Sequence, residues 1–238
     1  MKKHIQAFCL AVLTAFIILL PAATEAAEQT VPILSIDGSG KSTASPDQAF
    51  ISLGVITQAP EAQNAQSQNS AIANAIQASL SEIGIPEKCI QTRNYSFQIL
   101  YSHERGHQDE ITGYTVNNTV TVEVNDVSLV GKVIDAALSN GANRVSSLTF
   151  NIRDTKQLRK ETLSNAIKDA REKADIIASG LGKSIVGVQN VSESSGNILP
   201  RVYGNMMLAR SAAMDTTPIE AGTIDLSASV HIDFILSN

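Results

Sequence analysis

The segment YTVNNTVTVEV, residues 114–124, alternates apolar and polar side chains and constrains the fold more than any motif. A period of two places alternate side chains on opposite faces of a β-strand. The segment is therefore predicted to be a strand with one buried face. The rest of the chain must supply the elements that cover this face.

A strand, a helix and a second strand are predicted before this segment. Residues 50–57 are rich in β-branched side chains, and the run from Ile90 through Ile99 alternates, so both are predicted strands. Between them, Pro60 and Glu61 suit the first turn of a helix, and Gly84 suits its end. The apolar residues at helical spacing in this helix are Ile72, Ile76, Leu80 and Ile83.

The order strand, helix, strand is repeated from residue 114 onward. Asn125 or Asp126 can cap a helix, Asn140-Gly141 ends it, and residues 145–152 form another predicted strand. The residues of this helix that are predicted to face inward are Leu129, Val130, Val133, Ile134, Ala137 and Leu138. This order is that of a split βαβ arrangement (βαββαβ), so we expect an α+β fold with an antiparallel or mixed sheet covered by helices.

A further helix and two strands are predicted beyond this core. Asp154 is placed as the N-cap of the helix, with Gln157 three residues later for a capping box. Its predicted buried stripe consists of Leu163, Ile167, Ala170, Ala174, Ile177 and Leu181. The strands are expected over residues 185–191 and 223–236. The chain then divides into halves at about 31–110 and 111–193, a long loop 194–220 and a final strand within 221–236.

The N-terminus has the layout of a secretory signal peptide over residues 1–26. Lys2 and Lys3 precede an apolar run, and small residues surround Glu25 at the expected cleavage site. The alternative is an uncleaved membrane anchor, because the stretch 5–23 is nearly long enough to span a bilayer. The short apolar core and the good processing site favour cleavage and a periplasmic location.

Charge and cysteine content narrow the partners. Cleavage after Ala26 removes two of 18 basic residues and one of 23 acidic residues, leaving a net charge of −6. This acidic balance without a basic stripe argues against nucleic acid as a partner. Of the two cysteines, only Cys89 remains after cleavage, which rules out an intrachain disulfide. We expect Cys89 to be a small buried residue, the alternative being a reactive thiol.

Residues 38–43, GSGKST, resemble half of a nucleotide-binding loop. A complete P-loop needs a further glycine where this chain has Ser35, and a helix beginning at Lys41. Ser45-Pro46-Asp47 instead indicates a turn that leads into a strand. We therefore expect a glycine-rich strand end, with Gly38 and Gly40 serving backbone geometry, and no bound nucleotide.

Residues 103–107, HERGH, match the zinc-protease pattern H-E-x-x-H. That pattern works on a helix, which places both histidines on one face. The surrounding residues alternate with a period of two, and Gly106 lies where the helix would have to run. A solvated hairpin loop is the favoured interpretation. A metal-dependent hydrolase using His103, Glu104 and His107 is the alternative function.

The irregular stretch 192–221, which includes the long loop 194–220, contains every methionine that remains after signal cleavage. Methionine, tyrosine and arginine suit adaptable contacts, and methionine is also readily oxidised. We expect this loop to contact a neighbouring copy or the membrane, the alternative being that it simply covers its own domain. The candidate contact residues are Arg201, Tyr203, Met206, Met207, Leu208 and Met214.

A set of short motifs along the exported chain resembles one known family. They are Gly38-x-Gly40, Pro46-Asp47-x-Ala49, Gly84-Ile85, Thr92, Gly113-Tyr114-x-Val116, Asn118, Gly141-Ala142-Asn143, Phe150 and the helix LSNAIKDAREKADIIASGLG, residues 163–182. The chain is similar to the SIMPL-domain proteins, which include bacterial periplasmic immunogenic and oxidative-stress-defence proteins. The resemblance covers nearly all of residues 27–238.

The resemblance implies an α+β fold, a cell-envelope location and self-association. It carries over no active-site residues and implies no cofactor. The expected function is that of a non-enzymatic periplasmic protein that forms a homo-oligomer and contributes to envelope or oxidative-stress tolerance.

Overall fold

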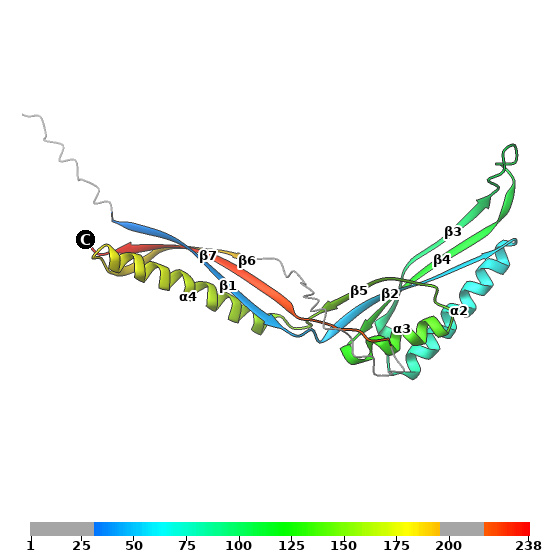
Figure 1. The fold of residues 1–238 in the computed structure, drawn as a ribbon, viewed down its shortest axis with the longest axis horizontal. Helices are drawn as coiled ribbons and strands as arrows, with labels where there is room; N and C mark the ends of the chain where they lie inside the picture. The colour runs from blue at the N-terminus through cyan, green and yellow to red at the C-terminus, as the bar shows by residue number, and fades with distance from the viewer. Residues whose placement is uncertain (1–30, 196–216) are drawn as a thin grey trace, which may run out of the picture.

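The computed structural model describes residues 31–195 and 217–238, and they form two lobes joined end to end (Figure 1). One lobe is built from residues 48–151, and the other combines elements from both ends of the chain. The first lobe consists of β2 (Gln48–Ala59), α2 (Ala62–Glu82), β3 (Ile90–Tyr101), β4 (Ile111–Val124), α3 (Val130–Ser139) and β5 (Arg144–Asn151). The second consists of β1 (Ile33–Ala44), α4 (Lys156–Gly180), β6 (Ile185–Ser195) and β7 (Ile224–Leu236).

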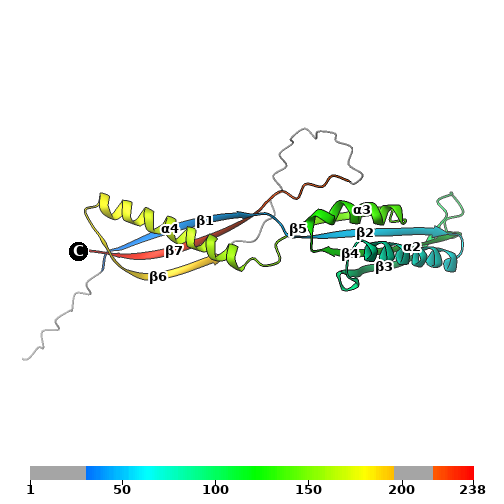
Figure 2. The same cartoon turned by 90° about the horizontal axis from the view of Figure 1, so that it is seen from below.

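The first lobe has the predicted split βαβ arrangement. Its four strands are ordered β3-β4-β2-β5, and neighbouring strands are antiparallel. Both helices lie on one face of this sheet (Figure 2). The strand that was predicted from its alternation, β4, contributes Val116, Val122 and Val124 to the buried face. The α+β prediction is confirmed.

The core of the first lobe forms where the helices meet this face. From α2, Ile76 and Leu80 are buried, and Ile72 and Ile83 pack against them, as their spacing predicts. In α3, Val130, Val133, Ile134 and Ala137 are buried, but Leu138 is largely exposed, contrary to the prediction. Leu138 follows Ala137 on the helix, and the rotation of 100° per residue carries it out of the contact. Asp126 caps the short turn Val127–Leu129 that leads into α3.

One polar side chain ties α2 to the sheet from within the core. Asn69 is almost fully buried, and its Nδ2 donates to the main-chain oxygen of Val55 on β2 at 2.9 Å. The same nitrogen lies 3.4 Å from the main-chain oxygen of Val116 on β4. The Nδ2 donor therefore serves two strands and fixes the position of the helix, while Asn69 Oδ1 has no hydrogen-bond partner among the described residues.

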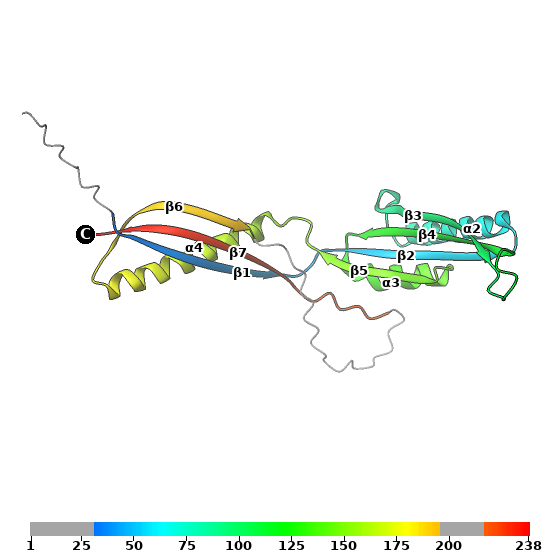
Figure 3. The same ribbon diagram turned by 90° about the horizontal axis from the view of Figure 1, so that it is seen from above.

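The second lobe is a three-stranded antiparallel sheet, β1-β7-β6, with α4 packed along one face (Figure 3). The buried face of α4 is a stripe of small residues spaced four apart. The stripe consists of Thr162, Ala166, Ala170, Ala174 and Ala178. It packs against Ile36 of β1 and against Val230, Ile232 and Phe234 of β7.

Gly38 and Gly40 bring α4 close to β1. A Cβ atom added at Gly38 would lie 2.6 Å from Ala170 Cβ, and one at Gly40 would lie 2.1 Å from the main-chain oxygen of Thr162. The glycines were predicted near a strand end, and this was wrong: they lie in the middle of β1, beneath the helix. They are required because the helix backbone approaches the strand backbone too closely for any side chain.

The predicted stripe of α4 was partly wrong for the same reason. Ala170 and Ala174 are buried as expected, but Ile167, Ile177 and Leu181 are exposed. A helix held this close to its sheet buries alanine and leaves larger aliphatic side chains at the margins. The N-cap position of α4 is Thr155 and not the predicted Asp154, which lies one residue earlier and accepts a hydrogen bond from the Lys156 amide at 2.9 Å.

Two contacts connect the lobes. Asp47, between β1 and β2, accepts hydrogen bonds from the Arg153 amide and from Arg153 Nε at 2.9 and 3.1 Å. The bond from the Arg153 amide is the main cause of the lowered pKa of Asp47. Before β7, Thr217 donates to Asp135 of α3 through its amide and its hydroxyl, and Ile219 packs on the first core.

Candidate interaction surfaces

The outer edge of β1 is closed by polar side chains of α4. Asn165 donates to the main-chain oxygen of Lys41, Asp169 accepts from the Ser39 amide, and Lys173 donates to the main-chain oxygen of Asp37. The three helix residues are spaced four apart, and their partners are alternate residues of one strand edge. Edge strands invite pairing with other chains unless they are covered. This edge is covered.

The opposite side of the second lobe is apolar and exposed. Val188 and Val191 of β6 pair with Phe234 and Ile232 of β7, which are buried beneath α4, yet both valines are largely solvent-accessible. On the flank of α4 that faces β6, Ile167 is 45% exposed, and Arg171, one turn further along the same flank, lies over the ring of Phe234 at 6.0 Å. We call this the α4–β6 surface. Its exposed aliphatic residues are Ile167, Val188 and Val191, whereas Ile176, Ile177 and Leu181 are exposed on the back of α4 and on its β1 side.

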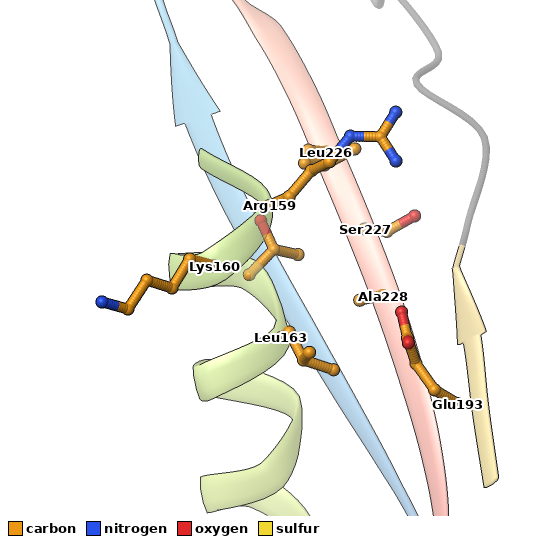
Figure 4. A pocket seen from close by; sticks show the side chains of 8 residues that line it. Arg159, Lys160, Leu163, Glu193, Leu226, Ser227 and Ala228 are labelled. Atoms are coloured by element: carbon orange, nitrogen blue, oxygen red, sulfur yellow. The ribbon is translucent and has the colours of Figure 1, made fainter. Parts of the chain in front are cut away.

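A small cavity opens at the start of α4, where the helix passes over β7 (Figure 4). Its volume is about 230 Å³, and Leu163, Leu226 and Ala228 provide its apolar lining. Arg159 and Glu193 bring charges of opposite sign to its walls. Such a small, mixed lining does not define a ligand class, and we treat the cavity as one end of the α4–β6 surface.

A second exposed apolar row lies in the first lobe. Tyr95, Phe97 and Ile99 of β3 alternate with polar residues, as the sequence predicts, but they are 50%, 44% and 41% exposed. They lie on the sheet face that carries the helices, because Phe97 is paired with the buried Val116. The helix α2 lies over β2 and β4 and stops short of this edge strand. The row is therefore an uncovered continuation of the core face.

The HERGH segment lies in the loop between β3 and β4, as the hairpin interpretation predicts. Gly106 has a positive φ of 96°, and His107 Nδ1 lies 2.8 Å from Glu110 Oε1. A β-hairpin loop does not present the two histidines on one helical face, which is the geometry on which the zinc-protease pattern depends. In residues 31–195 and 217–238, no group of three or more histidine, cysteine, aspartate or glutamate residues is arranged to hold a metal ion.

A Ser–Asp–His arrangement on β1 and β7 is not a catalytic triad. The Ser35 hydroxyl donates to Asp233, whereas a nucleophilic serine must donate to the histidine. His231 Nδ1 is instead paired with Asp37 at 2.8 Å, and this hydrogen bond is the main cause of its raised pKa. The cluster is a set of exposed cross-strand pairs.

The GSGKST segment is part of a continuous strand. Residues 38–43 are paired with residues 225–230 of β7, so no loop or helix N-terminus is present to surround a phosphate group. The Lys41 side chain is exposed, and Asn165 Nδ2 donates a hydrogen bond to the main-chain oxygen of Lys41.

We predict that Lys41→Ala changes the free energy of unfolding by no more than about 0.5 kcal/mol, because it alters an exposed side chain and keeps the main-chain contact. Urea unfolding measures this change. We also expect ATP to leave the melting temperature unchanged. An ATP-dependent rise that Lys41→Ala abolishes would contradict this account.

Cys89 is buried next to the start of β3, as predicted for a residue without surface chemistry. Its sulfur accepts a weak contact from Asn125 Nδ2 at 3.8 Å.

The predicted contact residues of the long loop lie outside the described residues. They are Arg201, Tyr203, Met206, Met207, Leu208 and Met214.

These features define an α+β protein with two open apolar surfaces, and comparisons identify its family. The family model SIMPL, "Protein of unknown function (DUF541)", matches residues 34–234. The 26 kDa periplasmic immunogenic protein of Brucella melitensis is 31% identical over 213 residues, which cover 84% of this chain and 83% of that protein. This chain belongs to the SIMPL family.

Two more distant relatives carry the name "Uncharacterized protein YggE". The protein from Edwardsiella ictaluri is 25% identical over 209 residues and covers 87% of each chain. That from Escherichia coli K12 is 25% identical over 204 residues, with 85% of this chain and 80% of that protein covered. Across the described ranges, no helix combines the length and the apolar character needed to cross a membrane.

Proposed function

We propose that this chain is a non-enzymatic periplasmic protein that assembles with copies of itself and contributes to cell-envelope or oxidative-stress tolerance. The observation that carries the proposal is the α4–β6 surface. In the second lobe, α4 buries its alanines, and Ile167 of α4 and Val188 and Val191 of β6 stay exposed. Exposed apolar patches of this kind mark contact surfaces, because their burial on association is favourable.

Three further facts support the location and the role. The sequence begins with a signal-peptide pattern, and the Brucella relative is named as a periplasmic protein. The edge strand β6 carries part of the α4–β6 surface, and a strand edge can pair with another copy. Met206, Met207 and Met214 belong to a residue type whose oxidation is reversible, which suits a protein exposed to oxidants.

The mass in solution of residues 27–238, produced without an affinity tag, tests the proposal. We expect a defined multiple of the chain mass. A monomer at every concentration would contradict self-assembly. Zinc at one ion per chain that is lost in His103→Ala would instead favour the metal-dependent hydrolase.

Deleting residues 200–214 tests the contribution of the candidate contact residues. We expect the shortened protein to lose part or all of its assembly, because the segment is rich in apolar, methionine and arginine side chains, which are residue types suited to interfaces. Sedimentation velocity at matched concentrations measures the loss. An unchanged oligomeric state would show that residues 200–214 are not part of the interface.

A further inference from the structure

The strand β3 forms one edge of the first sheet, and it contains a regular stretch that no described strand covers. Its pairing with β4 is irregular between Thr92 and Asn94 and again between Leu100 and Tyr101. Between these points, residues 94–100 are paired without interruption on their inner side. Their outer N–H and C=O groups face away from the sheet, and such a row is a template for another extended chain.

The apolar row of β3 follows this same stretch. Tyr95, Phe97 and Ile99 are spaced two apart on the helix face, and the ring of Phe97 stacks on Tyr114 of β4 with centroids 5.5 Å apart. An added strand would place every second side chain beside this row, because neighbouring strands keep their faces in register.

An unpartnered polar atom lies at one end of the row. Asn118 is paired with Tyr95, is only 8% exposed, and has no hydrogen-bond partner for its Oδ1 in the part of the chain that the structure describes. It lines a cavity of about 90 Å³ together with Ala73 and Gln77 of α2 and Thr92 of β3. Asn69 Oδ1 and Asn117 Oδ1 are likewise unpartnered among the described residues, so Asn118 marks a polar end of the row and the binding argument rests on the strand edge and the apolar row.

The residues that line the row and the cavity are uncharged. Residues 62–81 of α2 and residues 94–100 of β3 contain no Asp, Glu, Lys, Arg or His, and the carboxylate nearest the cavity, Glu87, accepts a hydrogen bond from Gln77 Nε2 at 3.3 Å. An anionic ligand would lose water there without gaining a cationic partner. The lining therefore fits a neutral ligand and does not fit nucleic acid or anionic lipid.

We propose that the β3 edge binds an extended, uncharged segment of another polypeptide with alternating apolar side chains, as a fifth strand of the sheet. Main-chain hydrogen bonds to residues 94–100 would provide the pairing, and the row Tyr95-Phe97-Ile99 would select apolar side chains at alternate positions. A half-buried strand has this pattern, and it becomes accessible when a β-rich protein has not yet folded. The partner class is therefore unfolded β-strand segments of exported proteins. This binding does not depend on the self-assembly proposed above.

Fluorescence anisotropy of a labelled peptide tests the proposal on residues 27–238. The probe is a nine-residue peptide of alternating valine and threonine with two C-terminal lysines for solubility. We expect saturable binding that Phe97→Lys weakens by about tenfold or more, as for a central interface residue. The matched control Gln98→Lys, on the opposite face of the same strand, should change the affinity by less than about twofold. Ile99→Lys provides a second variant if Phe97→Lys does not fold.

Two peptides with N-methyl groups on alternate amides test the main-chain pairing. One set of amides faces β3 and the other faces away, so only one of the two peptides should lose binding. Equal binding of both would overturn the proposal.

The two other possible occupants give different results. The proposal is overturned if the neutral oligosaccharide chitotetraose binds in a Phe97-dependent way and the peptide does not. It is also overturned if the peptide fails to bind while Phe97→Lys reduces the mass in solution, because the row would then be an interface between copies. Sedimentation of the same samples shows whether the chain self-assembles, so a failure of peptide binding can be distinguished from a failure of self-assembly.

Discussion

Replacing Gly40 by alanine is expected to lower the free energy of unfolding of the second lobe by about 3 kcal/mol. The new Cβ atom would lie 2.1 Å from the main-chain oxygen of Thr162 and 2.5 Å from the main-chain nitrogen of Ala166. These are backbone atoms of α4, so no side chain can rotate away and the whole helix must shift. Urea unfolding followed by circular dichroism measures the loss.

Gly187 in β6 of the same sheet provides the matched control. An added Cβ there meets Ile235 Cδ1 at 3.5 Å, which is ordinary van der Waals contact with the end of a flexible side chain. We expect Gly187→Ala to change stability by less than about 1 kcal/mol. Similar losses in both variants would show that the close approach of α4 to β1 does not cause the loss of stability in Gly40→Ala.

Replacing Asn69 by aspartate is expected to cost about 3 kcal/mol or more at pH 7. The substitution keeps the shape of the side chain but places a buried carboxylate opposite the main-chain oxygens of Val55 and Val116. Burial and these acceptors disfavour the charged form, so the pKa of the new carboxyl is raised above its unfolded value of about 3.9.

The sign of the pH dependence follows from this raised pKa. The folded state holds its proton to higher pH than the unfolded state, so stability falls as pH rises from about 3.9 to the folded-state pKa. The deficit relative to the unchanged protein should therefore shrink toward pH 4. The control Asn74→Asp, on the exposed side of α2, should lose less than about 0.5 kcal/mol. A deficit at Asn69 that does not change with pH would contradict burial of an ionised group.

The sequence predicts the first lobe well because periodicity and turn signals agree there. Large apolar residues at helical spacing identify the buried face of α2, and alternation in 114–124 identifies β4 and its buried face. For α4 the same reasoning misplaced the stripe, because it assumed that the largest apolar residues are buried. The available signal was Gly38-x-Gly40 together with small residues at every fourth position of the helix, a combination that indicates close backbone packing.

The exposed surfaces could be predicted only in part. Alternation in β3 correctly identifies one apolar row, with Tyr95, Phe97 and Ile99 on the same face. Whether a helix covers that row depends on where α2 crosses the sheet, and local sequence does not encode this position. Likewise, the exposure of Val188 and Val191 follows from the displacement of α4 toward β1, which is a property of the packed lobe.

The most direct test of the proposed self-assembly compares two double variants of residues 27–238 by sedimentation velocity. Ile167→Lys with Val188→Lys places charges on the α4–β6 surface, and Ser164→Lys with Ser192→Lys adds the same charges at exposed polar positions of the same elements. We predict that the unchanged chain and the serine double variant sediment as the same multimer, while the Ile167/Val188 variant dissociates toward the monomer. A monomeric unchanged chain, or an Ile167/Val188 variant with the mass of the unchanged chain, would contradict the account.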